Sequence, residues 1–324
     1  MCRMARFGCH CNCMAKIPTH DVIIVGGGAA GLSAGLVLAR AQADVLIIDS
    51  GHPRNAPAHQ MHGFLSRDGM DPKGFLEAGR REFVSYNGAI IHSTVSQAAG
   101  QAGSFRLTLD DGSAETTRAI LVATGLSDDL SLVPGMHERW GTLVHHCPYC
   151  HGYEVSSQRI SVIGGQAREM SIKQAGLLRR YSDAVTFVTN DIQLEQAERN
   201  RLEAIGVRII EGLVTHLNGA FGTLTSIALS DGSVVDSDAV FIAPTQHPHD
   251  TLLRALGCSV SDVSGLVTTD GFGQTSVPGV WAAGNVVSPT AQVITAAGAG
   301  GASAIAINGW LLHHDIDAAV AARN

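Results

Sequence analysis

The sequence predicts an α/β protein in which one strand–helix domain is inserted into a second domain of similar design. Apolar runs of strand length lead into glycine turns at two places, residues 26–31 and 164–165. After each turn the chain repeats a helix, a strand and a small β-meander, whose turns read DDGS at 110–113 and SDGS at 230–233. This duplication indicates two Rossmann-like, three-layer ββα domains, the second within the first.

Composition sets the class of protein. The 324 residues are enough for about two domains, and 45% hydrophobic with 16% charged residues is typical of a globular chain. The net charge of −7, without a run of Lys or Arg, argues against a nucleic-acid partner. Polar residues interrupt the apolar stretch 280–312, and the N-terminus lacks the apolar segment of a signal peptide. We therefore expect no membrane span and a cytoplasmic location.

The first glycine turn, residues 26–31, carries a complete dinucleotide-binding pattern. A strand at 21–25 precedes its GxGxxG sequence, a helix at 32–40 follows, and a second strand ends at Asp49. In this pattern the glycines allow a tight turn, the approach of a pyrophosphate and close packing of helix on strand, and the acid accepts from a ribose hydroxyl. The turn residues expected at the cofactor are Gly26, Gly28, Ala29, Ala30 and Gly31.

A Cys-Pro-Tyr-Cys sequence at 147–150 precedes the second glycine turn. Two thiols at this spacing can close a disulfide, and the spacing lowers a thiol pKa enough to make the sulfur reactive. The same pattern also forms half of a zinc site. The remaining downstream cysteine, Cys258, has no cysteine close to it in the sequence, so a redox centre is favoured over a four-thiolate zinc site. Metal binding by His145, His146 and the thiols stays an alternative.

Four of the seven cysteines lie in the first fourteen residues. They surround His10 and are Cys2, Cys9, Cys11 and Cys13. A metal-binding or redox tail is one interpretation. We expect instead a disordered extension over residues 1–19, because no second ligand cluster accompanies it and chain termini are often mobile. We expect no metal site.

The order of these motifs resembles the low-molecular-weight thioredoxin reductases, which are of the pyridine nucleotide-disulfide oxidoreductase type. The matching segments are the first glycine turn, 123–125, 147–150, 279–285 and 292–297. The resemblance implies an FAD-binding domain in two parts, 20–126 and 247–324. It also implies a homodimer and an NAD(P)H-domain-like insert, 127–246, that carries the two cysteines.

The same resemblance gives residues their roles. Cys150 would face the flavin and Cys147 would exchange with substrate. The pair Gln292-Val293, at a helix start, would lie under the isoalloxazine edge, where a helix N-terminus stabilises negative charge. The pair Gly284-Asn285 would contact the ribityl and phosphate region, where the family usually has Gly-Asp. The remaining residues expected at FAD are Ala123, Thr124 and Gly125.

The second glycine turn departs from that family. Gln166 stands where a glycine normally lets a pyrophosphate approach, and Glu169 adds negative charge in the first helical turn. Asp191 follows the next strand, where the family has a basic cluster for the 2′-phosphate of NADPH. An aspartate repels that phosphate, but it also suits the 2′-hydroxyl of NADH. NAD(P)H therefore stays uncertain as a cofactor.

Three histidines surround the cysteine pair in the sequence, namely His145, His146 and His151. An imidazole that titrates near neutral pH can take a proton from a thiol. A substrate dithiol must lose protons before it attacks a disulfide, because the thiolate is the nucleophile. His151 is the candidate base and His146 the second candidate. The alternative is that these side chains only cap strands or donate to carbonyls.

The CPxC sequence followed by His-Gly-Tyr-Glu also resembles the dithiol oxidases of the gliotoxin and holomycin type. In that subgroup electrons pass from a substrate dithiol to a protein disulfide, to FAD and to O2, giving H2O2. We therefore expect an FAD-dependent dithiol oxidase acting on a small-molecule dithiol or a small redox protein. The alternatives are an NAD(P)H-dependent thioredoxin reductase, a ferredoxin-fed reductase and a non-catalytic FAD-binding scaffold. His59 and His62 are candidates for the substrate pocket.

Overall fold

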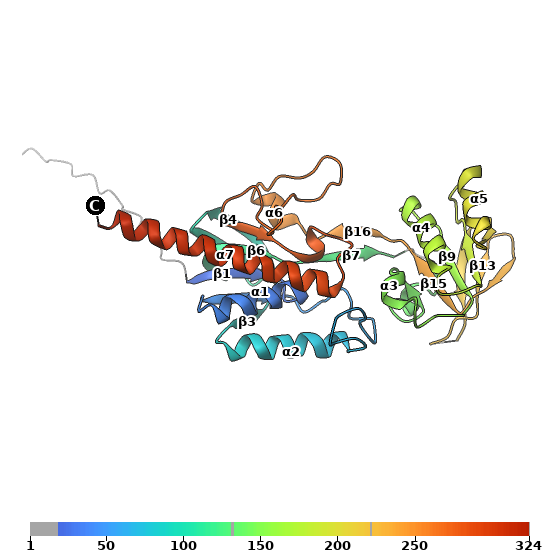
Figure 1. Ribbon diagram of the computed structural model, residues 1–324, viewed down its shortest axis with the longest axis horizontal. Helices are drawn as coiled ribbons and strands as arrows, with labels where there is room; N and C mark the ends of the chain where they lie inside the picture. Colours follow the sequence, from blue (N-terminus) through green and yellow to red (C-terminus); the bar gives the residue numbers. More distant parts are fainter. Residues whose placement is uncertain (1–18, 131–132, 221, 324) are drawn as a thin grey trace, which may run out of the picture.

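The computed structural model describes residues 19–130, 133–220 and 222–323. Two sheets with their helices form two bodies joined by a pair of extended strands (Figure 1). The α/β class with two Rossmann-like domains expected from the sequence is confirmed. The cysteines of the expected N-terminal extension lie outside the described residues.

The first sheet holds seven strands in the order β3-β2-β1-β6-β5-β4, with β17 also paired to β6. They are β1 (His20–Val25), β2 (Val45–Asp49), β3 (Ala89–His92), β4 (Val95–Gln101), β5 (Ser104–Leu109), β6 (Ala114–Val122) and β17 (Val280–Ala282). β1, β2, β3, the end of β6 and β17 run parallel, whereas β4 and β5 are antiparallel additions. The parallel strands therefore end at one edge, where α/β proteins bind ligands.

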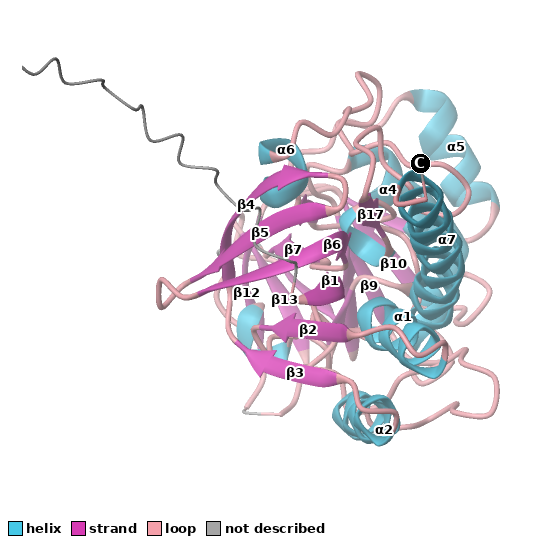
Figure 2. Ribbon diagram, turned by 90° about the vertical axis from the view of Figure 1, so that its left-hand side faces the viewer, coloured by secondary structure: helices cyan, strands magenta, loops and turns pink. Residues whose placement is uncertain are grey.

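Three long helices cover one face of this sheet (Figure 2), namely α1 (Ala29–Arg40), α2 (Pro72–Ser85) and α7 (Val293–Ala321). Along β1, Val22 and Ile24 pack toward these helices and Ile23 and Val25 toward the opposite core. Both faces of the strand are therefore buried, as expected for the centre of a parallel sheet. A methyl group on Gly300 of α7 would lie 2.0 Å from a carbonyl oxygen of α1, so the two helices meet closely there.

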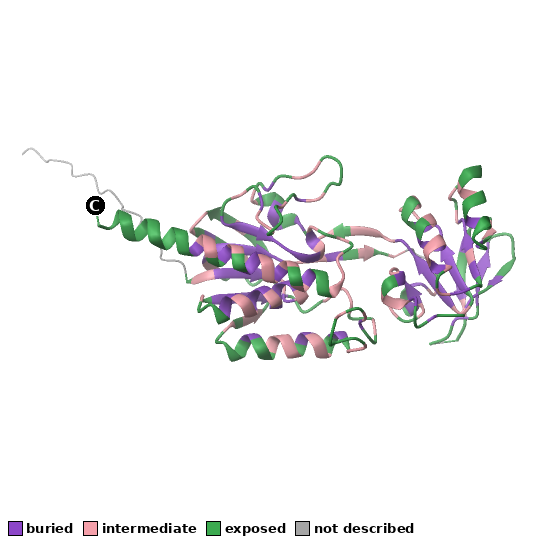
Figure 3. Cartoon of the chain, viewed as in Figure 1, coloured by how far each residue is buried: buried purple, intermediate pink, exposed green. Residues whose placement is uncertain are grey.

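The insert is built on a parallel sheet of order β11-β10-β9-β15-β8. Its strands are β8 (Val144–His145), β9 (Ile160–Ile163), β10 (Val185–Val188), β11 (Arg208–Ile210) and β15 (Ala239–Ile242). A small antiparallel sheet adds β12 (Val214–Asn218), β13 (Ser226–Leu229) and β14 (Val234–Asp236). The insert's helices are η1 (His137–Arg139), α3 (Pro148–His151), α4 (Arg168–Leu178) and α5 (Gln196–Ala204). Figure 3 shows that each body has its own buried centre.

The two connections between the bodies pair with each other. β7 (Leu126–Asp129) and β16 (Thr245–Pro248) form a two-stranded antiparallel ribbon. The chain enters the insert through β7 and leaves it through β16, then continues into α6 (Thr251–Ala255) and, beyond β17, into η2 (Gly284–Val286). The pairing fixes where the insert begins relative to the first sheet. No helix of the described ranges is long and apolar enough to cross a membrane.

The third glycine of the first turn has a packing role that can be tested. A methyl group on Gly31 would lie 1.9 Å from the Gly26 carbonyl oxygen. We expect Gly31→Ala to lower the free energy of unfolding by about 3 kcal/mol, the upper end of overpacking costs. Gly271→Ala is the control, because a methyl there would meet no atom within 4 Å. Urea unfolding of both variants is monitored by circular dichroism. Equal unfolding midpoints for the two variants would contradict the close contact at Gly31.

Candidate functional site

A cavity of about 540 Å³ lies between the carboxyl ends of β1, β2 and β6 and the insert. Three of the four predicted catalytic residues line it, namely Cys150, His146 and His151. The fourth, Cys147, and the predicted cofactor residue Gly31 are not among the lining residues. The predicted cofactor residues in its wall are Gly26, Gly28, Ala29, Ala30, Asp49, Ala123, Thr124, Gly125, Gly284, Asn285, Gln292 and Val293. Both halves of the predicted site thus share one space.

The first glycine turn leaves the room that a pyrophosphate needs. A methyl group on Gly28 would meet no atom within 4 Å, and Gly28 directly precedes α1 without a side-chain cap. The first N–H groups of α1 therefore stay available to an anion. Gly26 has a φ of +105°, and a methyl there would lie 2.4 Å from the Ala123 carbonyl oxygen. The turn is therefore open at Gly28 and closely packed against Ala123 at Gly26. The open side gives the diphosphate of FAD room to reach the backbone N–H groups.

Asp49 is held in place by two donors. Its Oδ1 accepts from the Gly27 backbone N–H at 3.0 Å, and its Oδ2 accepts from Arg80 at 3.2 Å. The carboxylate is buried, and Arg80 reaches the cavity from α2. The arginine is a site residue that the sequence motifs do not reveal, because no fixed spacing links α2 to the glycine turn.

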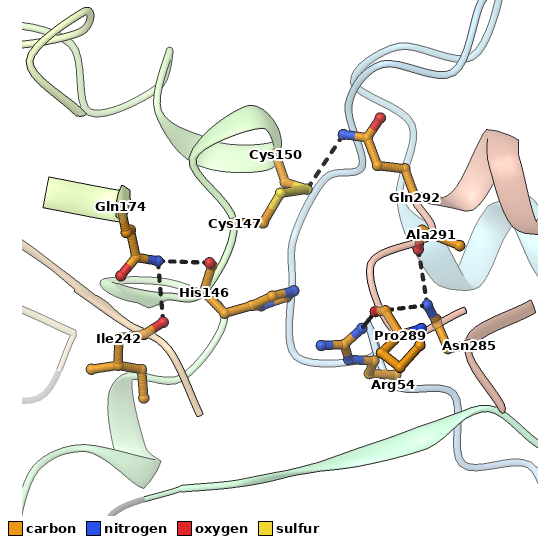
Figure 4. Close-up of a disulfide and its surroundings, with 10 residues drawn as sticks. All are labelled: Arg54, His146, Cys147, Cys150, Gln174, Ile242, Asn285, Pro289, Ala291 and Gln292. Atoms are coloured by element: carbon orange, nitrogen blue, oxygen red, sulfur yellow. Dashed lines mark hydrogen bonds between the residues drawn. A yellow bond between two sulfur atoms is a disulfide. The ribbon is translucent and has the colours of Figure 1, made fainter. Parts of the chain in front are cut away.

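Asn285 lines the cavity, and its amide nitrogen contacts the loop that follows it. Its Nδ2 lies 3.0–3.1 Å from the carbonyl oxygens of Ser288, Pro289 and Ala291. Figure 4 shows the contacts with Pro289 and Ala291. These contacts hold the loop that leads into α7. The side chain therefore shapes the cavity wall with its donor, and only its amide oxygen is left for a ligand.

Cys147 and Cys150 form a disulfide at the start of α3. Cys147 is the N-cap of this short helix, and its carbonyl oxygen accepts from the backbone N–H groups of Cys150 and His151. The helix thereby places Cys150 in the cavity wall, with Cys147 bonded to it. Gln292, from the first domain, points its Nε2 at the Cys150 sulfur at 3.9 Å (Figure 4).

His145 and His151 stack on each other behind the disulfide. Their ring centroids are 4.3 Å apart with an interplanar angle of 19°. The Nδ1 atoms of both rings are buried and have no hydrogen-bond partner among the described residues. Burial lowers the pKa of His145 to about 3, with His151 and His146 adding to the shift. Burial also lowers the pKa of His151, against the opposing effect of Glu154.

His146 lies on the other side of the site, against Trp140. The two rings stack with centroids 5.6 Å apart, and the Gln174 amide donates to the His146 carbonyl oxygen at 2.8 Å. Burial, followed by the nearby Arg54 guanidinium, lowers the pKa of His146 to about 4. All three imidazoles that surround the disulfide are therefore neutral at neutral pH.

Polar contacts between the first domain and the insert lie around the cavity near these rings. Arg54 makes a two-pronged pair with Asp128 of β7, with both distances 2.7 Å, and its third nitrogen lies 3.4 Å from the Pro289 carbonyl. His62 lies 3.3 Å from Glu154 of the insert and 3.4 Å from Asp68. His62 lines the cavity and His59 does not.

The second glycine turn is occupied by the protein's own groups. Gln166 accepts from the Thr245 hydroxyl at 3.2 Å, across the mouth of the turn. The Asn190 amide donates to the Gly164 carbonyl at 2.9 Å, and its oxygen accepts from a β12 N–H. Arg168, at the start of α4, pairs with Glu198. The nearest cation is thus already neutralised, and Asp191 is exposed beside the turn.

Two further sequence candidates lie away from this chemistry. Cys258 is buried and donates its thiol to the Thr275 hydroxyl at 3.4 Å. Burial raises the pKa of this thiol, which makes it unreactive. Within the described part of the chain, no group of three or more His, Cys, Asp or Glu side chains is arranged to hold a metal ion.

Comparisons with known proteins agree with this geometry. Residues 20–301 match the model of the pyridine nucleotide-disulphide oxidoreductase family. The chain is 28% identical over 322 residues to the thioredoxin reductase sirT of Leptosphaeria maculans, covering 94% of this chain and 98% of that protein. The crystal structure of HlmI superposes with a TM-score of 0.90 at 45% identity, covering 94% and 96% of the two chains. The oxidoreductase from Agrobacterium tumefaciens gives 0.85 at 34% identity, covering 91% and 99%.

The neutral state of His145 predicts a pH dependence of stability. The folded pKa lies below the ordinary 6.5, so the unfolded chain binds one more proton as the pH falls below that value. Stability is therefore full above pH 6.5 and is lost on acidification, by about 1.4 kcal/mol per pH unit from this residue. We expect wild type to lose about 2 kcal/mol more than His145→Phe between pH 7 and pH 5 in urea unfolding. Parallel pH profiles would contradict the assignment.

Proposed function

Because the chain belongs to the pyridine nucleotide-disulphide oxidoreductase family, we propose that it is an FAD-dependent dithiol oxidase. The substrate is a small-molecule dithiol or a small redox protein, and O2 is the final acceptor. The overall reaction converts a dithiol and O2 into a disulfide and H2O2, so that two electrons and two protons are transferred. Family membership confirms the enzyme class, a thioredoxin reductase-like oxidoreductase acting on disulfides, and the FAD cofactor.

The observation that carries the proposal is the placement of two neutral imidazoles, those of His146 and His151, in the same cavity as Cys150. At neutral pH both rings are unprotonated, so each has a nitrogen that can accept a proton from a thiol, and the lowered pKa makes each of them a weaker base than an exposed histidine. Oxidation of a dithiol releases protons that such groups can accept. We infer the oxidative direction from the placement of these unprotonated rings beside Cys150.

The chain's own residues divide the sulfur chemistry between them. His151 takes a proton from the substrate, and the resulting thiolate attacks the Cys147 sulfur. The bond between the cysteines breaks, and Cys150 leaves with the bonding electron pair. The second substrate thiol gives its proton to the second candidate base, His146, and attacks the first substrate sulfur, which forms the product disulfide and releases Cys147 as a thiolate. FAD, when bound, supplies the two-electron transfer between the cysteine pair and oxygen.

The geometry of the second glycine turn supports O2 over a nicotinamide donor. The side chains of Gln166 and Asn190 form hydrogen bonds with neighbouring residues, and Arg168 is paired with Glu198. A pyrophosphate arriving there would need to displace these contacts and would meet the negative charge of Glu169 in the first turn of α4. A thioredoxin reductase that uses NADPH needs this place free.

An anaerobic reduction experiment tests the function. The purified yellow protein is mixed with a small dithiol, with NADPH, with NADH or with reduced ferredoxin, and flavin absorbance is followed in a stopped-flow instrument. We expect rapid bleaching by the dithiol and no bleaching on the same timescale by the other three donors. Admission of air then yields one H2O2 per dithiol. Rapid bleaching by NADPH would contradict the oxidase proposal and favour a thioredoxin reductase.

Variants of the same protein serve as controls. Cys147→Ser and Cys150→Ser should each abolish dithiol-driven bleaching, because either change removes the disulfide. His151→Ala should slow it by about 100-fold, and raising the pH should recover part of the rate by ionising the substrate thiol directly. Cys258→Ser should leave the rate unchanged. An unchanged rate in His151→Ala removes this residue from the mechanism.

The homodimer expected from the resemblance is also a proposal, supported by α7. Large apolar side chains and open glycines recur every three or four residues along the face opposite its buried one. The exposed fractions are 68% for Ile305, 58% for Leu312, 50% for Ile316 and 55% for Val320. Methyl groups on Gly298, Gly301 and Gly309 would meet no atom within 4 Å. Such a stripe on a helix suits a second copy packed about a two-fold axis.

Sedimentation measurements test the dimer. Leu312→Glu combined with Ile316→Glu should convert the protein to a monomer, because each carboxylate would be buried without a partner. Ala318→Glu is the matched control, because it lies on the other side of the same exposed end of α7. A wild-type protein that sediments as a monomer rules the proposal out.

The domain limits at 126/127 and 246/247 and the cytoplasmic location stay predictions.

A further inference from the structure

Gln292 belongs to the first domain, but its side chain contacts a reacting atom of the insert, the Cys150 sulfur. Its Nε2 lies 3.9 Å from the Cys150 sulfur, within the range of a hydrogen bond to sulfur. Figure 4 shows the amide reaching from the start of α7 across the gap to the disulfide. Among the described residues, no other hydrogen bond joins a cysteine of the pair to a side chain of the first domain. The contact is therefore a direct link between the two halves of the site.

The position of Gln292 in the fold gives this contact its direction. The residue is the N-cap of α7, a helix of 29 residues, and its backbone is extended with φ −73° and ψ 169°. The positive end of the helix dipole and the amide hydrogens therefore lie on the side of the cavity where Cys150 lies. Both favour negative charge on that sulfur over the uncharged sulfur of a disulfide.

We propose that Gln292 is a catalytic residue of the proposed dithiol exchange, in which its amide stabilises Cys150 as the leaving thiolate. When a substrate thiolate attacks Cys147, a new sulfur–sulfur bond forms, the Cys147–Cys150 bond breaks, and the electron pair stays on Cys150. The charge that entered on the substrate sulfur thus ends 3.9 Å from the Gln292 nitrogen. An interaction that strengthens as charge arrives lowers the barrier as well as the energy of the product.

The contact also sets how readily the disulfide is reduced. A hydrogen bond to the thiolate lowers the pKa of Cys150 and raises the reduction potential of the pair, because both changes favour the charged reduced form. The other charged or titratable groups of the cavity near this sulfur are His146, His151, His62, Arg54 and Asp128. Glu154 pairs with His62 at the same place. None of these changes when Gln292 is replaced, so a comparison of variants isolates the amide.

The test uses Gln292→Met, which keeps the length of the side chain and removes the donor, and Gln292→Glu, which replaces the donor with a charge. In the holoenzyme with Cys147→Ser, the rate at which iodoacetamide alkylates Cys150 is followed by mass spectrometry against pH. We expect the pH midpoint to rise by about one unit with Gln292→Met, equal to a tenfold loss of thiolate preference. Gln292→Glu should raise it further, because its carboxylate repels the thiolate.

A second readout keeps the proposal testable if alkylation is blocked by the flavin. Holoenzyme with both cysteines is equilibrated anaerobically with dithiothreitol buffers at saturating FAD, and the fraction of reduced pair is counted after thiol trapping. Gln292→Met should lower the equilibrium constant for reduction about tenfold, or about 30 mV. Midpoints and equilibrium constants equal to wild type in both variants overturn the proposal.

This inference rests on the proposed function for its substrate but fails separately from it. The midpoint and the potential are measured without O2 and without a nicotinamide, so they stay informative even if NADPH proves to be the donor. Conversely, a dithiol that bleaches the flavin normally in Gln292→Met supports the oxidase and removes Gln292 from the exchange step. A slower exchange that is recovered with Gln292→Asn at the same FAD occupancy would support the hydrogen bond over a merely structural role.

Discussion

The site depends on where the insert places the Cys150 sulfur. This sulfur lies at a cavity that the first sheet helps to form. Cys150 lines that cavity together with the first glycine turn, although more than a hundred residues separate them. The paired strands β7 and β16 bring the insert to this place, and the Arg54–Asp128 pair attaches the cavity wall to β7. Electron transfer between sulfur and flavin needs van der Waals proximity, so these connections are as necessary as the cysteines.

Burial is the second determinant, because it decides which way protons move. The cavity buries His145 and half-buries His146 and His151, and the buried Nδ1 atoms of His145 and His151 have no partner among the described residues. Protonating any of these rings is therefore less favourable than protonating an exposed histidine, and all three are neutral at neutral pH. The same effect leaves their nitrogens unprotonated beside the disulfide and makes them weaker bases.

Much of this was predictable from sequence, and the rest fails for definite reasons. The glycine turn, Asp49 and the cysteine pair lie within short segments whose spacing is fixed by a strand and a helix, so their geometry follows from pattern. Arg80 and Asp128 were not predicted, since they reach the cavity through tertiary packing of α2 and β7, which no local spacing encodes. Asn285 was expected to contact the cofactor, and it lines the cavity, but the sequence did not reveal that its donor also holds the following loop. A one-residue change from the family pattern gives no sign of such a rearrangement.

Cys150 belongs to the cavity wall, whereas Cys147, to which it is bonded, is not among the lining residues. In the proposed reaction a substrate thiolate therefore attacks a residue beside the cavity and not one of its wall. The space against Cys150 would then stay available to the flavin while the product forms.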